Sequence, residues 1–159
     1  MNDTSDIRAA LVSTRTRFDA AIAGLPPGTL TDTPAVGVWP VRNVVAHLID
    51  WHSELLRAAE YGLGGPRPTD HPITGDAYND TSVARHADEP WAQLDADLGE
   101  VFKHAVTLAN RCTPDELSAP AEFPWGGTGT VEELLRAIVE HQEEHNAQIE
   151  AWRATGAPV

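Results

Sequence analysis

Residues 130–152, TVEELLRAIVEHQEEHNAQIEAW, contain the pattern that decides the fold of this chain. Apolar side chains recur there at steps of three and four residues, which is the spacing of one buried face on an α-helix. Thr130 and Glu133 have the spacing of a helix capping box, and Gly156 follows the stretch. The pattern predicts a long final helix from about Thr130 to Gly156. Its buried stripe would consist of Leu134, Leu135, Ile138, His141, His145, Ile149 and Trp152.

Three earlier segments show the same helical spacing of apolar residues, and none shows the two-residue alternation of a strand. Proline-rich residues 26–34 interrupt the chain after the first segment, because proline cannot sit inside a helix. The segment 113–117, TPDEL, is predicted to be a single turn capped by Thr113. We therefore expect one all-α domain over residues 1–159, an up-and-down four-helix bundle. The three earlier helices are expected at about Ser5–Leu25, Pro40–Gly62 and Trp91–Asn110, the last preceded by a weakly helical piece at 76–86.

The composition excludes several classes of partner. The formal net charge is −13, and Lys103 is the single lysine among 11 basic residues. Nucleic acids and anionic membranes are bound by clustered basic side chains, so neither is an expected partner. Cys112 is the only cysteine, which excludes an internal disulfide, and the first residues show no signal-peptide pattern. We expect a cytoplasmic protein.

The strongest chemical feature is the pair His141 and His145 in the sequence HQEEH. Residues four apart lie one turn above each other on the same helix face. Both histidines fall within the apolar stripe of the final helix, so both side chains are predicted to point into the bundle. Two imidazoles at this spacing can bind one metal ion. The alternative interpretation is a pair of core histidines that are hydrogen-bonded to neighbours.

A third ligand would come from the second helix, which offers His47 and His52. On a helical wheel His52 lies near the middle of the apolar face, whereas His47 lies toward its edge beside Trp51. Amphipathicity alone favours His52 as the buried residue, but an edge position can line a cleft between helices. The residue pattern leaves both candidates open.

The remaining polar residues are interpreted as ordinary surface or core positions. Asp50 and Glu54 are expected to be exposed rather than to orient a histidine, and Cys112 is expected to be buried or inert. Tyr78 and Asn79 are candidates to face the cleft. Solvent exposure is predicted for Glu140, Glu143 and Glu144, core packing for Trp39, Trp51, Trp125 and Trp152, and no organised partners for His71, His86 and His104.

Two stretches resemble the DinB-like superfamily. Residues 38–52, VWPVRNVVAHLIDWH, are similar to its second helix, in which a metal-binding histidine stands in an AHL context. Residues 140–152, EHQEEHNAQIEAW, are similar to its last helix, with HxxxH followed by a glutamine and an apolar residue. The resemblance implies His47, His141 and His145 as the metal ligands. The middle of the chain, GDAYND with EPW and TPDEL, resembles the branch that includes colibactin self-protection hydrolases.

The resemblance also implies a function. Related branches include mycothiol-dependent maleylpyruvate isomerases and bacillithiol or glutathione S-transferases. It implies an enzyme that uses zinc or nickel on three histidines to activate a low-molecular-weight thiol such as mycothiol, or water, toward a small electrophile. It further implies a homodimer. The alternatives are a self-protection protein that sequesters or hydrolyses a reactive metabolite without a metal, and a bundle without chemistry.

Overall fold

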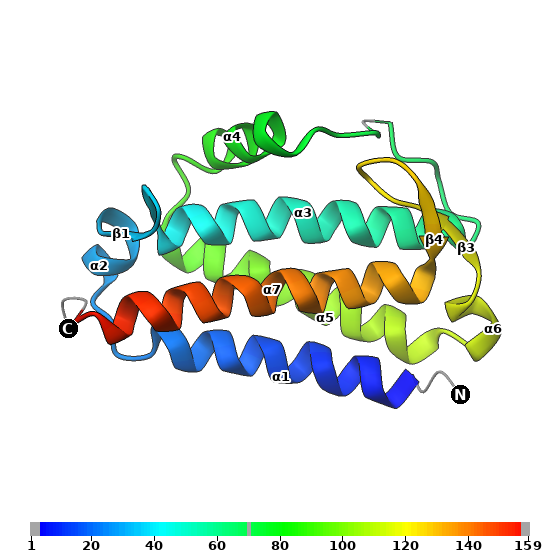
Figure 1. The fold of residues 1–159 in the computed structure, drawn as a ribbon, viewed down its shortest axis with the longest axis horizontal. Helices are drawn as coiled ribbons and strands as arrows, with labels where there is room; N and C mark the ends of the chain where they lie inside the picture. The colour runs from blue at the N-terminus through cyan, green and yellow to red at the C-terminus, as the bar shows by residue number, and fades with distance from the viewer. Residues whose placement is uncertain (1–3, 70, 157–159) are drawn as a thin grey trace.

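Four long helices form the body of the structure, a computed structural model that describes residues 4–69 and 71–156 (Figure 1). Helices α1 and α3 each pack against both α5 and α7, so the four enclose one core. The predicted all-α four-helix bundle is confirmed. The bundle helices are α1 (Thr4–Ile22), α3 (Val41–Gly62), α5 (Trp91–Arg111) and α7 (Val131–Ala154).

The core consists of the apolar stripes that the sequence predicted. Phe18 of α1, Leu48 of α3 and Ile138 of α7 are fully buried. Burying side chains of this size stabilises the fold by about 1.5–3 kcal/mol each. The outward faces of the helices are polar, and none of the described helices is long and apolar enough to cross a membrane.

Helix α1 ends at Ile22, three residues before the predicted end at Leu25. Gly24 has a φ of 76°, in the left-handed region that glycine adopts without steric cost. Such a residue just after the last turn is a common way to end a helix. Leu25 is buried although it lies beyond the end of α1, so its apolar character continued the helical pattern and made the predicted helix too long.

Short elements that the sequence did not predict lie between the long helices, and the break at the prolines is confirmed. The proline-rich break contains a short helix, α2 (Pro27–Asp32), which begins with a proline at its first position. Strands are present as well, in two antiparallel hairpins. Strands of two or three residues are too short to show alternation in the sequence. The hairpins are β1 (Pro34–Val36) with β2 (Trp39–Pro40), and β3 (Pro120–Glu122) with β4 (Thr128–Thr130).

The connection between α3 and α5 is a crossover that runs the length of the bundle. It contains α4 (Gly75–Arg85), which lies outside the bundle along α3 (Figure 1). The chain thereby returns to the end at which α3 began, so α3 and α5 run in the same direction rather than up and down. The weakly helical piece predicted at 76–86 is therefore a separate helix. The turn predicted at 113–117 is confirmed as α6 (Pro114–Leu117) with a capping box from Thr113.

The capping box predicted at the start of α7 is present. The backbone N–H of Thr130 donates to the Glu133 carboxylate at 2.7 Å, and the Glu133 N–H donates to Thr130 Oγ1 at 3.2 Å. The box satisfies backbone donors that the first turn of a helix leaves unpaired. It also determines where α7, the helix with two of the three candidate ligands, begins.

We predict that Thr130→Ala lowers the free energy of unfolding by about 1 kcal/mol, because it removes one acceptor of the box. Urea denaturation followed by circular dichroism measures the change. Thr107→Ala is the matched control: Thr107 is an exposed threonine within α5 whose hydroxyl donates to the Lys103 carbonyl. Alanine is a better helix former, so the control should be neutral or slightly stabilising. Equal effects of both substitutions would contradict the prediction.

Candidate metal centre

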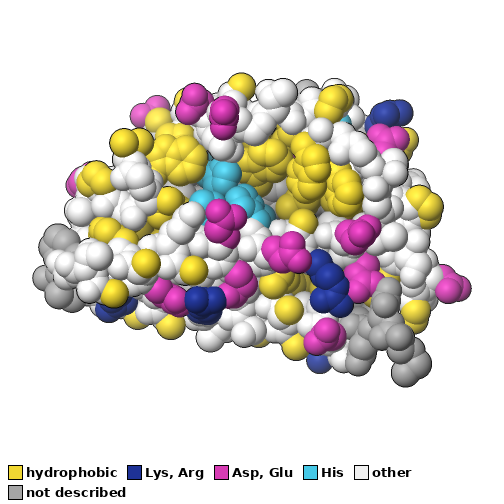
Figure 2. Space-filling model, in the orientation of Figure 1, with side chains coloured by type: hydrophobic (Ala, Val, Ile, Leu, Met, Phe, Trp, Pro, Cys, Tyr) yellow, Lys and Arg dark blue, Asp and Glu magenta, His cyan; other side chains and the backbone are white. Residues whose placement is uncertain are grey.

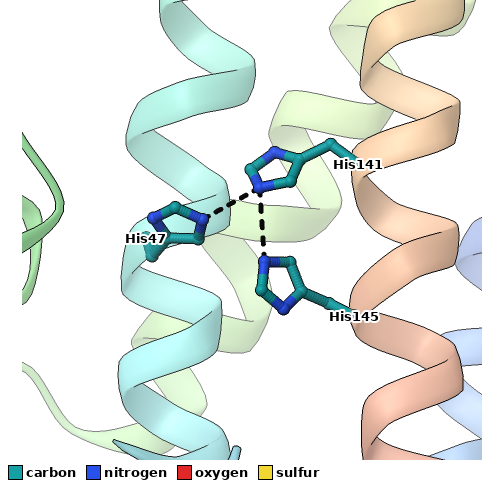
Figure 3. A group of neighbouring side chains, drawn as sticks. All are labelled: His47, His141 and His145. Atoms are coloured by element: carbon teal, nitrogen blue, oxygen red, sulfur yellow. Dashed lines mark hydrogen bonds between the residues drawn. The ribbon is translucent and has the colours of Figure 1, made fainter. Parts of the chain in front are cut away.

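Helices α3 and α7 bring three imidazoles together in the middle of the bundle. His141 and His145 point from successive turns of α7 toward α3, and His47 points from α3 toward them (Figure 3). The shared inward face that the HxxxH spacing predicted is confirmed. His47, His141 and His145 each contribute one ring nitrogen to a group of three atoms that lie within 4.8 Å of one another.

The three rings face one another through the same atom, Nε2. His47 Nε2 lies 2.9 Å from His141 Nε2, which in turn lies 3.2 Å from His145 Nε2. A neutral ring nitrogen offers either one N–H or one lone pair in the ring plane. The central Nε2 therefore cannot form a proper hydrogen bond with both neighbours. Hydrogen bonding within the group does not account for this convergence.

A divalent metal ion fits the arrangement of donors. Ligand nitrogens at 2.0–2.1 Å around a tetrahedral zinc ion lie about 3.3 Å apart, close to the 2.9 and 3.2 Å from His141 Nε2 to its two neighbours. Three imidazoles leave at least one coordination position free, which is the composition of catalytic rather than structural zinc sites. The group has the atoms, spacing and convergence that such an ion requires.

Burial keeps the rings neutral, as metal ligands must be. Burial, together with the neighbouring His145, lowers the pKa of His47 to about 4. Burial, with His47 and His145 nearby, lowers the pKa of His141 to about 3. The pKa of His145 is lowered mainly by burial as well. At neutral pH each ring therefore has a lone pair available.

His145 is also oriented by a neighbour on its own helix. Its Nδ1 lies 2.8 Å from Gln148 Oε1, an atom that can only accept a hydrogen bond. Nδ1 therefore carries the proton, and the lone pair of His145 is on Nε2, facing the group. Hydrogen bonds of this kind to the remote nitrogen orient metal-bound histidines in proteins. Nδ1 of His47 is buried and forms no hydrogen bond of normal geometry within the described chain.

His52 stays outside the group. It is fully buried, as the helical wheel indicated, but its ring lies against Phe102 at 5.5 Å and His141 at 5.4 Å between centroids. Neither ring nitrogen has a hydrogen-bond partner in the described chain. The wheel identified the more deeply buried histidine correctly. Depth of burial did not predict which histidine of α3 joins the group. The middle of the apolar face of α3 also packs against α5, and the edge of that face lies beside the cleft.

A cleft of about 400 Å³ opens beside the group. Figure 2 shows a patch of histidine at one end of a hollow with hydrophobic side chains inside it and acidic side chains along its rim. Asn79 of α4 lines the cleft, as expected, and its Oδ1 accepts a hydrogen bond from Trp51 Nε1 at 2.8 Å. Trp125 is half exposed, so core packing was the wrong expectation for it. The lining consists of His47, Trp51, Leu55, Asn79, Trp125, Ala137, Glu140, His141 and Glu144.

Two carboxylates of α3 hold α4 over the bundle, which contradicts the expectation that they are exposed. Asp50 and Glu54 are 7% and 4% exposed. Asp50 accepts a hydrogen bond from His86 at 2.9 Å, and Glu54 contacts His71 at 2.9 Å. The expectation that these histidines lack partners was also wrong. A sequence signal existed: Asp50 and Glu54 follow His47 on α3 at helical steps of three and four, which form a polar stripe beside the apolar one.

These contacts are charged and partly buried. Tyr78 of α4 donates a hydrogen bond to Glu54 at 3.2 Å, and burial together with Glu54 raises the pKa of its hydroxyl. Burial alone would lower the pKa of His86, but its hydrogen bonds to Asp50 and Glu89 raise it. Since α4 itself buries little beyond Ser82, these polar contacts are what attach it to α3.

The other candidates lie away from the histidine group. Cys112 is buried, as predicted, and burial raises the pKa of its thiol. His104, expected to lack a partner, lies 2.8 Å from Glu60 on the protein surface. Glu143 is paired with Arg17 of α1. Neither Cys112 nor His104 contributes to the cleft.

A sequence profile of the DinB superfamily matches residues 10–149, a span that reaches into all four bundle helices. The chain belongs to the DinB superfamily. The resemblance noted in the sequence is confirmed. No protein with a curated description matches this DinB-superfamily chain.

Solved structures share the fold. A mycothiol-dependent maleylpyruvate isomerase superposes with a TM-score of 0.77 at 10% identity, over 93% of this chain and 61% of the isomerase. This chain thus spans about three fifths of the isomerase. An uncharacterised protein from Escherichia coli UTI89 superposes with a TM-score of 0.80 at 17% identity, over 98% and 96% of the two chains. At these identities the similarity shows the fold alone.

We predict that the metal-free protein loses stability as the pH falls from about 6.5 to about 4. The unfolded chain takes up protons near the ordinary histidine pKa of 6.5, whereas the folded chain holds His47 and His141 neutral down to about 4 and 3. The unfolded state therefore binds more protons in this interval, and stability falls with pH. The loss is on the order of 3 kcal/mol for each of the two histidines. Urea denaturation at a series of pH values measures it.

The matched variants are His141→Leu and His104→Gln. The first removes a group with a lowered pKa, so its stability should fall less steeply over the same interval. The second removes an exposed histidine outside the group and should follow the wild type. Parallel pH curves for wild type and His141→Leu would contradict the assignment.

Proposed function

We propose that this DinB-superfamily protein is a metal-dependent enzyme that activates a low-molecular-weight thiol toward a small electrophile. The observation that carries the proposal is the convergence of three neutral imidazole nitrogens, His47, His141 and His145, at one end of an open cleft. The ligands would hold zinc or nickel, both of which imidazole binds well.

Three histidine ligands are more typical of a catalytic metal site than of a structural one. A divalent ion bound there would supply Lewis acidity at a free coordination position, where a thiol or water becomes more acidic. Gln148 fixes the tautomer of His145, and burial keeps His47 and His141 unprotonated. Trp51 and Trp125 form an apolar side of the cleft, which keeps water away from a reactive thiolate.

A thiol is favoured over water by one comparison. A structural relative with the same bundle is, by its name, mycothiol-dependent and an isomerase. We infer that the cleft accepts a thiol of comparable size, with the sulfur directed toward the three histidines. Hydrolysis and stoichiometric capture of a reactive molecule are the competing outcomes of the tests below.

We predict that wild-type protein, purified without a histidine tag, binds about one equivalent of zinc or nickel, and that His145→Ala abolishes this binding. Removing one of three ligands leaves two, which is too few for a stable site. Elemental analysis after dialysis measures the stoichiometry. His104→Ala is the control, because His104 is a surface histidine. Circular dichroism should show the same helix content in all three proteins.

The same experiment separates His47 from His52. His47→Ala should abolish metal binding, whereas His52→Phe, which keeps a ring of similar shape in the core, should retain it. Absence of metal from the wild type, or unchanged metal content in His141→Ala, would rule out the proposal. A large loss of helix in His145→Ala would instead favour a core role for these histidines.

We further predict that the metal-loaded protein consumes a thiol in many turnovers when an electrophile is in excess. 2-Mercaptoethanol with monochlorobimane is a practical probe pair, because the thiol carries no charged group besides its sulfur and the product is fluorescent. The metal-free protein and His145→Ala should show only the uncatalysed rate. One product molecule per protein would indicate capture, and loss of electrophile without loss of thiol would indicate hydrolysis.

A further inference from the structure

The charge of the cleft is unusual for a site beside a metal centre. Two of its nine lining residues, Glu140 and Glu144, are acidic, and none is lysine or arginine. They stand four apart on α7, so both carboxylates lie on the same side of the helix, one turn from each other. Both side chains are exposed to solvent, as expected. They also line the cleft, which the sequence did not indicate.

Within residues 4–69 and 71–156 these two carboxylates have no hydrogen-bond or ion-pair partner, in contrast to the acids beside them. Arg17 binds both Glu143 and Glu150 on the neighbouring face of α7. Like charges four apart on a helix repel each other and are mildly destabilising. A positive charge between Glu140 and Glu144 would convert this repulsion into attraction.

The opposite side of the cleft is aromatic and held in place by its neighbours. Trp51 is fixed by its hydrogen bond to Asn79 and by the edge-on contact with Tyr78, with ring centroids 5.0 Å apart. Trp125 stacks on Phe123 with nearly parallel rings, 5.1 Å between centroids, yet remains 50% exposed. A fixed, half-exposed indole in a cleft is a surface suited to an apolar group or to a cation over its face.

A third observation is a buried nitrogen beside the cleft. His47 is 5% exposed and lines the cleft, and its Nδ1 has no hydrogen bond of normal geometry within the described residues, although Asn79 lies near enough to raise the pKa of the ring. Buried polar atoms in native proteins are nearly always satisfied by protein, water or ligand. Together the carboxylates, indoles and this nitrogen describe a site that is negative, apolar on one side and incomplete without a ligand.

We propose that the substrate of this cleft carries a positive charge, with an ammonium group beside Glu140 and Glu144 and an apolar part against Trp51 and Trp125. Dicarboxylates are disfavoured, since Glu140 and Glu144 repel anionic groups and no lysine or arginine lines the cleft. The proposal rests on the proposed function in one respect: it takes the cleft beside the three histidines as the substrate site. Glu140 and Glu144 are then the residues that determine specificity.

The test compares phenethylamine with 3-phenylpropanoate, which share a ring and a two-carbon chain but have opposite charges. Metal-free wild-type protein is used, so that the carboxylate cannot bind a metal ion. Calorimetric titration at low salt should show the amine binding at least about fivefold more tightly, which is the size of one exposed ion pair. The preference should shrink at about 1 M salt, where charges are screened within about 3 Å.

The decisive variant is the double substitution Glu140→Gln and Glu144→Gln, which keeps the size of both side chains and removes both charges. It should abolish the preference for the amine. Glu100→Gln is the matched control: Glu100 is an exposed glutamate on α5 that does not line this cleft, so this variant should keep the preference. Circular dichroism confirms that each variant is folded.

Three results would overturn the proposal: equal or tighter binding of the carboxylate, a preference that survives in the double variant, or no binding of the amine up to about 10 mM, well above the millimolar affinity of a weak ligand. Failure of the proposed function would look different. If the wild type binds no metal but still prefers the amine, the proposed function fails and the proposal about substrate charge stands. If the metal-loaded protein turns over but shows no preference for the amine, only the proposal about substrate charge fails.

Discussion

The structure depends on one property of imidazole: a neutral ring has a single lone pair in its plane. Three Nε2 atoms meet between α3 and α7, with that of His141 in the middle, and one neutral nitrogen cannot form a proper hydrogen bond with both neighbours. Protonation, which would add a second N–H to a ring, is opposed by burial, since the pKa of His141 is lowered to about 3. A shared cation is the simplest way to satisfy all three nitrogens. The bundle supplies the rigid frame that holds them at this spacing.

Rigidity has a different source on each side of the site. On α7 it comes from a continuous apolar stripe with a capping box at its start, so the positions of His141 and His145 follow from the helix itself. On α3 the site-facing edge is covered by α4, which is held by Asp50 and Glu54 and by the contact of Tyr78 with Trp51. The same helix supplies Asn79, which holds Trp51 in the wall of the cleft. Polar burial outside the histidine group thus shapes the cleft beside it.

The bundle could be predicted because its helices are long and strongly periodic, and because glycines, prolines and capping boxes mark their ends. The elements that escaped prediction are short or depend on non-local contacts. The strands at 34–40 and 120–130 have too few residues for a pattern, and their turns rest on glycines with positive φ, such as Gly37 and Gly126. The direction of α5 followed from the path of the crossover, which residue periodicity does not encode.

The sequence by itself determined that this chain is a helical bundle and that His141 and His145 share its inner face, because both follow from the 3.6-residue repeat within one helix. Only the tertiary structure decided which histidine of α3 joins them. His47 and His52 lie on one helix, but His47 faces α7 at the edge of the cleft, whereas His52 lies between α5 and α7, and no property of α3 alone says where those neighbours are. The burial of Asp50 and Glu54 was decided in the same way, since a polar stripe is exposed or covered according to what packs over it.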